Sequence, residues 1–385
     1  MRPVPMSQPL HFVVAGHLCL DLTPALTGGW PQPGGLVEAG LLHFSGGGAV
    51  ANVGSALWRL GCPVRLIGLV GDDRLGEISI DLLQPLGNQT RIRIAPGQTT
   101  SYSIVVAPEG CDRAFLHCAG ANTVFTSADV RDEDLQGAGW LHFGYPPLMP
   151  AISADGGREL ADLFCRAKER GLRTSLDFCS IGGAATATDW QTVLRNCARA
   201  VTVFAPSIEE LRAVLRQPPR QAGDIDDVHS LACALFDMGF SIVAIKLGTS
   251  GVYLATTDVG ADLAAWQFGS EWRARELLAP CFRANVVNAT GAGDCAIAGF
   301  IASVASGGGP EQALTMAAAA GACSVEAADA SSGVRSMAEL QARIDSGWER
   351  IDSAAPGKDK DNNDNDWTYD PRVGVWNHVR EEIIR

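Results

Sequence analysis

The chain has 385 residues, of which 46% are hydrophobic and 19% are charged, and its formal net charge at pH 7 is -13. This length suffices for one large α/β domain or two ordinary ones, because single domains rarely exceed ~250–300 residues without splitting. An acidic chain without clusters of Lys and Arg is poorly suited to bind nucleic acids or anionic membranes, so we expect neither as a partner.

The first residues contain no apolar core of signal-peptide length, and no run reaches the ~20 apolar residues that span a bilayer. The eleven cysteines occur singly, and no C-x-x-C pair is present, which argues against a zinc site or a thioredoxin-type redox site. Together these features predict reduced thiols and a cytoplasmic location.

Alternating strand and helix patterns run through most of the chain and predict a doubly wound, mainly parallel sheet. The pattern begins with strands at 11–16 and 64–70 and helices at 49–60 and 75–86. Further strands are expected at 140–143, 173–178, 201–204 and 241–247. Further helices are expected at 156–170, 208–215, 228–238, 292–306, 312–327 and 337–351.

This rhythm breaks at residues 35–44 and again at 90–118. In these segments short runs such as R-I-R-I and S-Y-S-I-V-V alternate apolar and polar residues between turn residues, which is typical of antiparallel strands with one face in water. We predict that both segments form a small antiparallel β lid on the α/β body. Exposed strand edges can pair between subunits, so a homodimer through the lid is one hypothesis.

The end of the chain differs in composition from the rest. Residues 354–371 are too polar to build a core, so we predict one α/β domain over residues 10–352 and a disordered polar extension over 354–385. Within that extension, W-N-H-V-R-E-E-I-I-R (376–385) is expected to form a terminal helix.

The stretch N-A-T-G-A-G-D-C (288–295) raises the question of a phosphate site. It is neither a Walker A loop nor a Rossmann fingerprint, because the required lysine or third glycine is missing. Gly291, Ala292 and Gly293 expose backbone N–H groups at a helix start, where orphan donors and the helix dipole attract an anion. Asp294 is either a plain capping carboxylate or a general base beside a transferred phosphoryl group.

Other segments offer groups for the same site. The strand that contains Lys246 leads into the glycine turn G-T-S-G (248–251). The run S-I-E-E places Glu210 after a strand, at the sheet edge where ligands of open α/β sheets bind. A glycine run in S-G-G-G-A-V-A-N (45–52) precedes a helix, and Asp21 follows the first strand.

Four motifs occur in a characteristic order: G-G-G-A-V-A-N, G-L-V-G-D-D-R-L-G, K-L-G-T-S-G and N-A-T-G-A-G-D. With these motifs the chain resembles, over residues 12–333, the ribokinase-like (PfkB) family of carbohydrate kinases, and in particular its bacterial sugar kinases. The resemblance implies a three-layer α/β/α ribokinase-like fold with a β lid. It also implies ATP- and Mg²⁺-dependent transfer of a phosphoryl group to a hydroxyl of a sugar or sugar-like substrate.

The resemblance further implies a role for individual positions. Asp294 would be the general base, with an anion hole formed by Gly291, Ala292 and Gly293. The nucleotide-binding positions would be Thr249, Gly248, Gly251, Lys246 and Thr290. The substrate-binding positions would be Asp21, Gly47, Gly48, Asn52 and Asn122. The Mg²⁺ positions would be Glu210, acting through water, and Ser207.

Three positions depart from the family pattern. Ser207 stands where the family commonly has Asn, Asn288 where it often has an acidic residue, and Gly144 where some sugar kinases have an acidic substrate contact. Dependence on a monovalent cation and the identity of the sugar therefore stay open. A structural role for Lys246 and a capping role for Asn52 also stay open. A nucleoside kinase and a catalytically silent sugar- or nucleotide-binding regulator are the alternative functions.

Overall fold

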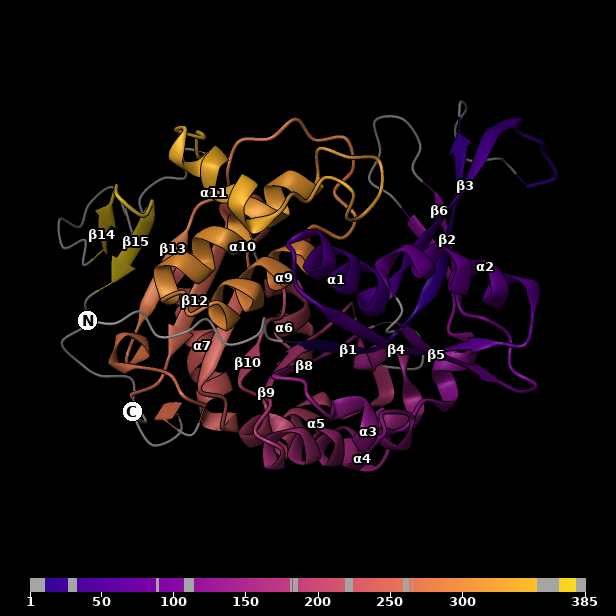
Figure 1. Cartoon of the computed structure of the whole chain (residues 1–385), viewed down its shortest axis with the longest axis horizontal. Coiled ribbons are helices and arrows are strands. Elements are labelled where there is room, and N and C mark those ends of the chain that lie inside the picture. The colour runs from indigo at the N-terminus through magenta and orange to yellow at the C-terminus, as the bar shows by residue number, and fades with distance from the viewer. Residues whose placement is uncertain are drawn as a thin grey trace.

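The computed structural model describes residues 11–26, 33–87, 90–106, 114–180, 182, 186–218, 224–258, 263–264, 266–351 and 367–378. None of the helices that these residues form is long and apolar enough to cross a membrane. The described residues form an α/β/α body and a small β-sheet that projects from one end of it (Figure 1).

A large mixed sheet forms the middle layer of the body. Its parallel strands are β1 (Phe12–Gly16), β4 (Val64–Gly71), β5 (Thr90–Ala95), β8 (Trp140–Gly144), β9 (Arg173–Asp177), β10 (Val203–Phe204) and β11 (Ile242–Lys246). Antiparallel strands continue it as β12 (Val252–Thr256), β13 (Glu276–Ala279), β14 (Trp367–Asp370) and β15 (Val375–His378). The order of these described strands is β14-β15-β13-β12-β11-β10-β9-β8-β1-β4-β5.

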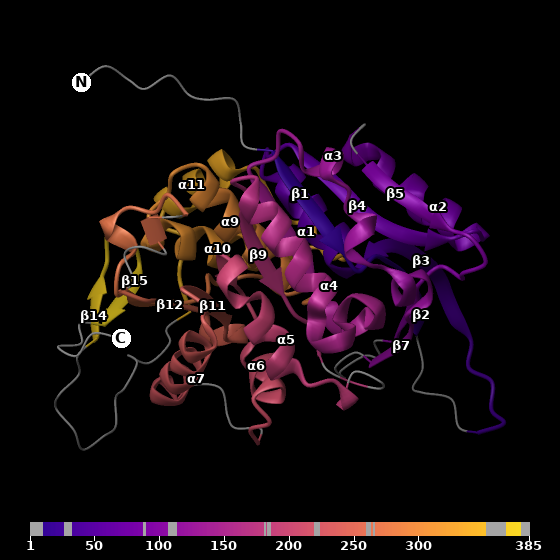
Figure 2. The same cartoon turned by 90° about the horizontal axis from the view of Figure 1, so that it is seen from below.

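Helices cover both faces of this sheet, and each set encloses its own hydrophobic core (Figures 1 and 2). One face carries α1 (Gly48–Arg59), α2 (Arg74–Leu83), α9 (Ala292–Ala305), α10 (Pro310–Ser324) and α11 (Met337–Asp345). The other face carries α3 (Asp132–Leu135), α4 (Pro150–Glu169), α5 (Trp190–Cys197), α6 (Ile208–Val214) and α7 (Ile225–Met238). The three-layer fold predicted from the sequence is therefore confirmed.

The sequences of β1 and α9 explain why these elements lie in the interior. β1 reads F-V-V-A-G and is buried throughout, as expected of a parallel strand covered on both faces. α9 reads A-G-D-C-A-I-A-G-F-I-A-S-V-A and is buried from Asp294 to Val304. Its small side chains let it pack closely between α1 and α10. This packing fixes the first turn of α9 in space.

The small sheet is the predicted lid. Its described strands lie in the order β3 (Ala39–Gly47), β2 (Cys19–Leu26), β6 (Tyr102–Val106) and β7 (Ala114–Cys118). The β2–β3 and β6–β7 pairs are antiparallel, whereas β2 and β6 run parallel. β2 follows β1 after only two residues, so the lid is joined directly to β1, which lies between β8 and β4 in the main sheet.

The prediction that all of residues 90–118 belong to the lid is wrong at its start. Residues 90–95 form β5, which pairs with β4 in parallel at the edge of the main sheet. An edge strand also alternates between covered and exposed residues, so its pattern resembles that of a lid strand. β2 was not predicted, because only two residues separate it from β1 in the sequence.

The prediction of disorder in the C-terminal segment is wrong for residues 367–378. These residues form the hairpin β14–β15, and β15 pairs with the edge strand β13. The expected terminal helix is wrong for residues 376–378, which belong to β15. Buried Trp367 and Val375 hold the hairpin in place. The remainder of the predicted extension, at 354–366 and 379–385, lies outside the described residues.

Candidate active site

Several parallel strands end at one edge of the sheet and carry polar side chains there. β1 is followed by His17, β8 is followed by Tyr145, β9 ends at Asp177 and β11 ends at Lys246. Ligands of open α/β sheets bind outside the carboxyl ends of the strands. This edge is therefore the candidate site.

The first turn of α9 faces the same edge. Gly291 precedes the helix with a left-handed φ of 75°, and a Cβ there would lie 2.5 Å from the Cβ of Ala330, so glycine is required. Ala292 and Gly293 begin the helix, where backbone N–H groups lack intrahelical acceptors. Asp294 follows them, with only 3% of its surface exposed. The N–H of Ala292 donates to the carbonyl of Ala289 over 3.4 Å. The turn thus places the amides of Gly291 and Gly293 next to a buried carboxyl group.

The carboxylate of Asp294 accepts hydrogen bonds from two other elements. The amide Nδ2 of Asn52 in α1 donates to Oδ2 over 2.9 Å. The hydroxyl of Tyr145 lies 2.8 Å from both Oδ1 and Oδ2. Burial raises the pKa of Asp294, whereas Lys246 and these two hydrogen bonds oppose the rise. A carboxylate whose pKa is raised is better matched to accept a proton near neutral pH.

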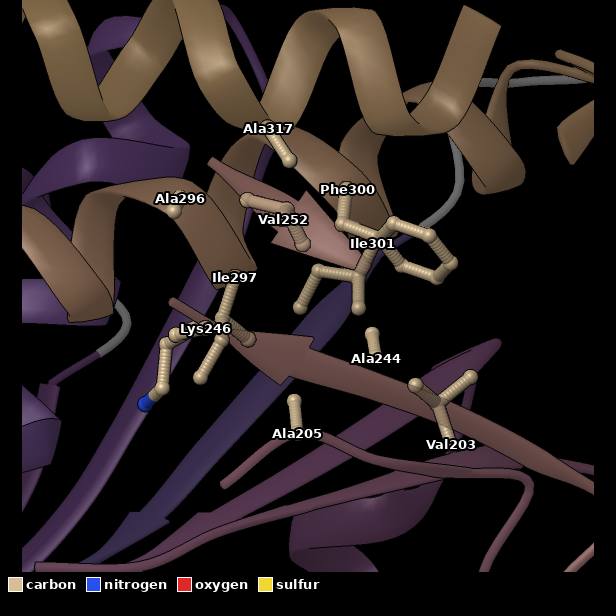
Figure 3. A pocket seen from close by; sticks show the side chains of 10 residues that line it. All are labelled: Val203, Ala205, Ala244, Lys246, Val252, Ala296, Ile297, Phe300, Ile301 and Ala317. Carbon is tan, nitrogen blue, oxygen red and sulfur yellow. The ribbon is translucent and has the colours of Figure 1, made fainter. Parts of the chain in front are cut away.

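Lys246 brings an ammonium group to this carboxylate. Figure 3 shows its aliphatic stem near Ile297, with the nitrogen pointing away from the apolar side chains around it. Nζ forms an ion pair with Oδ1 of Asp177 over 2.7 Å, and a Cβ on Gly293 would lie 3.4 Å from it. Burial lowers the pKa of Lys246, but Asp177 and Glu210 raise it by more. Lys246 therefore stays charged beside the α9 turn.

Two carboxyl groups other than Asp294 surround this ammonium. Oδ2 of Asp177 is buried without a hydrogen-bond partner among the described residues, and burial raises the pKa of Asp177 to about 8 against the effect of Lys246. Glu210 forms a capping box with Ser207, whose N–H donates to Oε2 over 2.7 Å and whose hydroxyl accepts from the N–H of Glu210. The hydroxyl of Ser207 thus caps the first turn of α6.

No group of three or more His, Cys, Asp or Glu side chains in the described part of the chain is arranged to hold a metal ion. Of the two carboxylate oxygens of Glu210, Oε2 accepts the hydrogen bond at the helix start. A carboxylate oxygen suits Mg²⁺, which keeps several waters and is commonly bound through one or two carboxylates together with substrate phosphates. Glu210 therefore fits a hydrated Mg²⁺, whereas Ser207 does not contribute a free ligand.

A pocket of about 370 Å³ adjoins the α9 turn. Gly248, Thr249 and Gly251 of the glycine turn line it, together with Ala292 and Gly293. Its apolar walls suit a flat organic ring, and the two glycine turns suit attached phosphates. Most of those walls come from β12, α9, α10 and the segments next to them: Val252, Phe282, Ala284, Val286, Ala296, Ala317, Ala318, Ala322, Val325 and Ile351.

Thr290 does not line this pocket but braces the loop before the α9 turn. Its hydroxyl and its N–H donate to Oδ1 of Asn288 over 2.7 and 2.9 Å. Nδ2 of Asn288 in turn donates to the backbone carbonyl of Ala328 over 2.7 Å. These contacts tie the loop to the segment after α10. They give the side chain of Thr290 a structural role that requires no direct contact with a nucleotide.

Asp21 and Gly47 lie where the lid joins the body. Gly47 leaves room for the carboxylate of Asp21, since a Cβ at this position would collide with both of its oxygens. Burial raises the pKa of Asp21 to about 6, hydrogen bonds with Cys19 and Ser103 oppose the rise, and the charge of Asp294 adds to it. Asp21 of the lid and Asp294 of α9 are therefore close enough for their charges to interact.

His17 occupies the same neighbourhood. Its ring is 1% exposed, and neither ring nitrogen has a hydrogen-bond partner among the described residues. The ring lies beside those of His117 and Tyr145, with centroid distances of 5.2 and 5.8 Å, and Gly48 lies directly against Nδ1. Burial lowers the pKa of His17 to about 3. The neutral ring offers one donor and one acceptor to a ligand.

Asn122 does not take the place expected of a substrate contact. Its Nδ2 donates to the carbonyls of Leu18 and Ala119 over 2.9 and 3.2 Å, and its Oδ1 accepts from the N–H of Leu18. The whole amide is thus used to fix the backbone between β1 and β2, and the residue is fully buried. We therefore leave it out of the candidate site.

Tyr145 is the site residue that the sequence analysis missed. It follows β8 in a left-handed conformation with φ of 67°, which is uncommon for a residue other than glycine. Two prolines, Pro146 and Pro147, follow it directly. A bulky residue between a strand and a Pro-Pro pair marks an unusual turn, but no spacing in the sequence connects it with Asp294.

Replacement of Asp21 by Asn tests the electrostatics of the lid junction. The folded-state pKa of about 6 exceeds the ordinary value of 3.8, so the folded protein retains a proton that the unfolded chain releases between these values. The unfolding free energy of the wild type should therefore fall as the pH rises through this window, by at most about 3 kcal/mol relative to the Asn variant. Urea unfolding of both proteins near pH 4 and near pH 8 measures the effect. An unchanged difference between the two proteins would contradict it.

The geometry can now be compared with known proteins. A sequence model of the pfkB family of carbohydrate kinases matches residues 10–337. The chain belongs to this family. As a pfkB carbohydrate kinase it is a phosphotransferase, and the matched region contains all of the candidate site except Ile351 in the pocket wall. The family match ends before the β14–β15 hairpin, which is an addition to the matched region.

Curated relatives and solved structures agree with this assignment. This pfkB kinase is 28% identical to the ATP-dependent ribose-1-phosphate kinase of Halopiger xanaduensis, over 80% of this chain and 89% of that protein. It is 25% identical to fructokinase-2 of Oryza sativa subsp. japonica, over 78% of this chain and 81% of that protein. The structure of Arabidopsis thaliana ribokinase complexed with ribose and ATP superimposes with a TM-score of 0.67 at 19% identity, covering 87% and 98% of the two chains, and supports the ribokinase-like fold.

Proposed function

We propose that this pfkB kinase transfers the γ-phosphoryl group of ATP to a hydroxyl of a small sugar or sugar-like polyol. One observation carries the proposal: a single turn of α9 contributes Gly293 to the apolar-walled pocket and Asp294 to the polar neighbourhood of the lid junction. A donor bound on one side of this turn and an acceptor bound on the other would meet at the turn. Membership of the family supplies the class of reaction.

In this proposal Asp294 is the general base. The acceptor hydroxyl gives its proton to the carboxylate while its oxygen forms a bond to the γ-phosphorus and the bond to the bridging oxygen of ADP breaks. Asn52 holds one carboxylate oxygen from α1, over 2.9 Å. The raised pKa of Asp294 suits a group that takes up a proton during the reaction.

The charge of the transferred group is held by fixed donors. The amides of Gly291, Ala292 and Gly293 form the anion hole at the positive end of α9. The ammonium of Lys246 lies beside Gly293 and adds a full positive charge. A Mg²⁺ ion held through water by Glu210 supplies further neutralisation of the phosphates when bound.

The pocket beside α9 accepts the nucleotide. The turn that contains Gly248, Thr249 and Gly251 approaches the phosphates through backbone groups, and the alanine-rich wall from α10 takes the base. Thr290 supports this arrangement from the preceding loop rather than by direct contact.

The acceptor site is polar and suits several hydroxyl groups. Acceptors and donors for these hydroxyl groups come from Asp21, Asn52 and the unpartnered ring of His17. Each of these groups loses water when a substrate binds, and a group left without a new hydrogen bond costs ~1–3 kcal/mol. The lid strands close over the acceptor and exclude water, which would otherwise compete for the phosphoryl group. A nucleoside kinase is the second candidate, because the adjacent rings of His17 and His117 could stack on a base.

A substrate panel tests the proposal. Release of ADP from Mg-ATP is measured with ribose, fructose, ketodeoxygluconate, fructose phosphates and nucleosides, each alone. We expect a sugar or sugar phosphate to give the fastest release, whereas a preference for nucleosides would favour the second candidate. If ATP and a sugar both raise the melting temperature but no acceptor releases ADP, the chain is a silent binding protein and the proposal fails.

Independence of monovalent cations is expected from the loop before α9. The amide of Asn288 donates directly to the carbonyl of Ala328 and accepts from Thr290, so the loop is closed without a bound cation. Replacement of K⁺ and Na⁺ by tetramethylammonium should leave kcat unchanged in a steady-state assay at constant ionic strength. The Asn288→Asp variant, in which a carboxylate faces a carbonyl oxygen, should lose activity and regain part of it with K⁺. Strong activation of the wild type by K⁺ would contradict this expectation.

We also propose that two copies associate through their lids. Several large apolar side chains on β3 and β7 are exposed, and Leu41 is 77% exposed. An apolar surface of this kind commonly marks an interface between proteins. The other exposed residues of this surface are Leu42, Phe44, Phe115 and Leu116. Light scattering of the purified protein distinguishes the dimer from a monomer.

A further inference from the structure

Tyr145 contacts the reacting carboxylate of Asp294 but transfers no proton in the proposed reaction. The hydroxyl of Tyr145 lies 2.8 Å from each carboxylate oxygen of Asp294, so its single proton is shared between them. An acceptor hydroxyl that gives its proton to the same carboxylate must approach the same two oxygens. Tyr145 therefore holds the base in the substrate-free enzyme by the kind of contact that the substrate later makes.

The backbone around Tyr145 is shaped to keep the phenol in this position. The residue adopts a left-handed conformation, its N–H donates to the carbonyl of Asp177 over 3.3 Å, and two prolines restrict the chain behind it. A left-handed conformation is unfavourable for a residue other than glycine and persists only where the surroundings determine it. Such strain next to a reacting group is consistent with a functional constraint rather than with packing alone.

The surroundings of the pair leave Tyr145 as a donor. Burial and the charge of Asp294 raise the pKa of Tyr145 well above its ordinary range, so the phenol stays protonated. The adjacent ring of His17 is neutral and cannot compete as a cation. The other titratable groups that interact with the Asp294 charge are Lys246, Asp177, Glu210, Asp21, Cys19, Cys179 and Cys295.

We propose that Tyr145 is a positioning residue that keeps the Asp294 carboxylate ionised and correctly oriented before the acceptor binds. This inference rests on the proposed role of Asp294 as the base. A hydrogen bond from a neutral donor to an anion stabilises the anion, so its removal makes Asp294 easier to protonate. The contact exists without substrate, so its effect can be measured without knowledge of the sugar.

The test follows the titration of the Asp294 carboxyl carbon by ¹³C NMR in aspartate-labelled, substrate-free protein, with Asp294→Asn identifying the resonance. In Tyr145→Phe the midpoint should move up by about one pH unit, the size expected for the loss of one charge-assisted hydrogen bond. Tyr253→Phe is the matched control, because its hydroxyl also donates to a buried carboxylate, that of Glu276, over 2.8 Å. In this control the Asp294 midpoint should stay where it is in the wild type.

A second variant covers the case in which Tyr145→Phe alters the fold. Incorporation of a fluorinated tyrosine at position 145 keeps the shape and makes the phenol a stronger donor, so the midpoint should move down. With the best acceptor from the panel, Tyr145→Phe should lower kcat and leave the KM for ATP unchanged. The inference is overturned if neither variant moves the midpoint. Full activity of Asp294→Asn would instead refute the proposed base and leave the titration result standing.

Discussion

Replacement of Asp294 by Asn is expected to lower kcat by about 10²–10⁴-fold, the contribution of a general base. Asn keeps the shape of the side chain, and its carbonyl oxygen can still accept from Tyr145 and Asn52, but it cannot take up a proton. The fold should survive, because burial already disfavours the charge on Asp294. A coupled assay for ADP gives kcat, and thermal unfolding gives the stability of the variant.

The control for this variant is Asp189→Asn. Asp189 is exposed at the start of α5, on the other face of the sheet from α9, and accepts from the N–H and the hydroxyl of Thr192, so the same chemical change is made outside the site. Its kcat should match that of the wild type. If Asp294→Asn keeps kcat within an order of magnitude of the wild type and has an unchanged melting temperature, Asp294 is not the base.

Replacement of Lys246 by Met should lower both stability and activity. Removal of one partner of a buried ion pair leaves the other charge uncompensated, at a cost of roughly 3–5 kcal/mol of unfolding free energy. The partner here is Asp177, whose Oδ1 lies 2.7 Å from Nζ. The kcat should fall as well, because the anion hole loses its full positive charge. Urea unfolding and the ADP assay measure the two effects separately.

The stability loss of Lys246→Met should depend on pH. Without the ammonium, the pKa of Asp177 rises further above its value of about 8, so protonation relieves the buried charge at lower pH. The deficit relative to the wild type should therefore shrink as the pH falls from alkaline to acidic values. Lys168→Met on the exposed face of α4 is the control and should show neither the deficit nor its pH dependence.

A double variant separates the structural role of Lys246 from its role in catalysis. Lys246→Met combined with Asp177→Asn removes both charges of the pair, so the unfolding free energy should recover much of its loss. The kcat should stay low, since the ammonium beside Gly293 is still absent. Recovery of both quantities would mean that Lys246 serves the fold alone, which is the structural role left open by the sequence.

The parallel half of the fold could be predicted because its signals are local. β1 is apolar throughout and β4 is apolar except for Arg65, and the helix α1 between them shows regular apolar spacing, so strand and helix could be told apart within short windows. β12 and β13 were missed because antiparallel return strands carry no distinct pattern, and the glycine turn before β12 was interpreted only as a ligand loop. The β14–β15 hairpin was missed because two buried residues in a polar segment give no periodicity.

The candidate site likewise contains features that could be predicted from the sequence and features that could not. The glycine turn at the start of α9 and the position of Asp294 in it were predictable because glycines, a helix start and a carboxylate follow one another in sequence. The hydrogen bonds of Asn122 to the backbone of Leu18 and of Tyr145 to Asp294 depend on tertiary placement, so the sequence revealed neither contact. No local sequence pattern reveals a side-chain contact between residues that are more than a hundred positions apart.

The contact between Asn52 and Asp294 joins residues 242 positions apart. This contact forms only after α9 has docked against α1. The two helices lie near opposite ends of the matched region, α1 near its start and α9 near its end. Closing a chain segment of this length costs loop-closure entropy before the contact can stabilise the fold. Under the proposed role of Asp294, a chain in which α9 has not yet docked lacks its positioned base. Recovery of turnover during refolding should lag behind the return of helical structure and mark the moment at which the last layer is assembled.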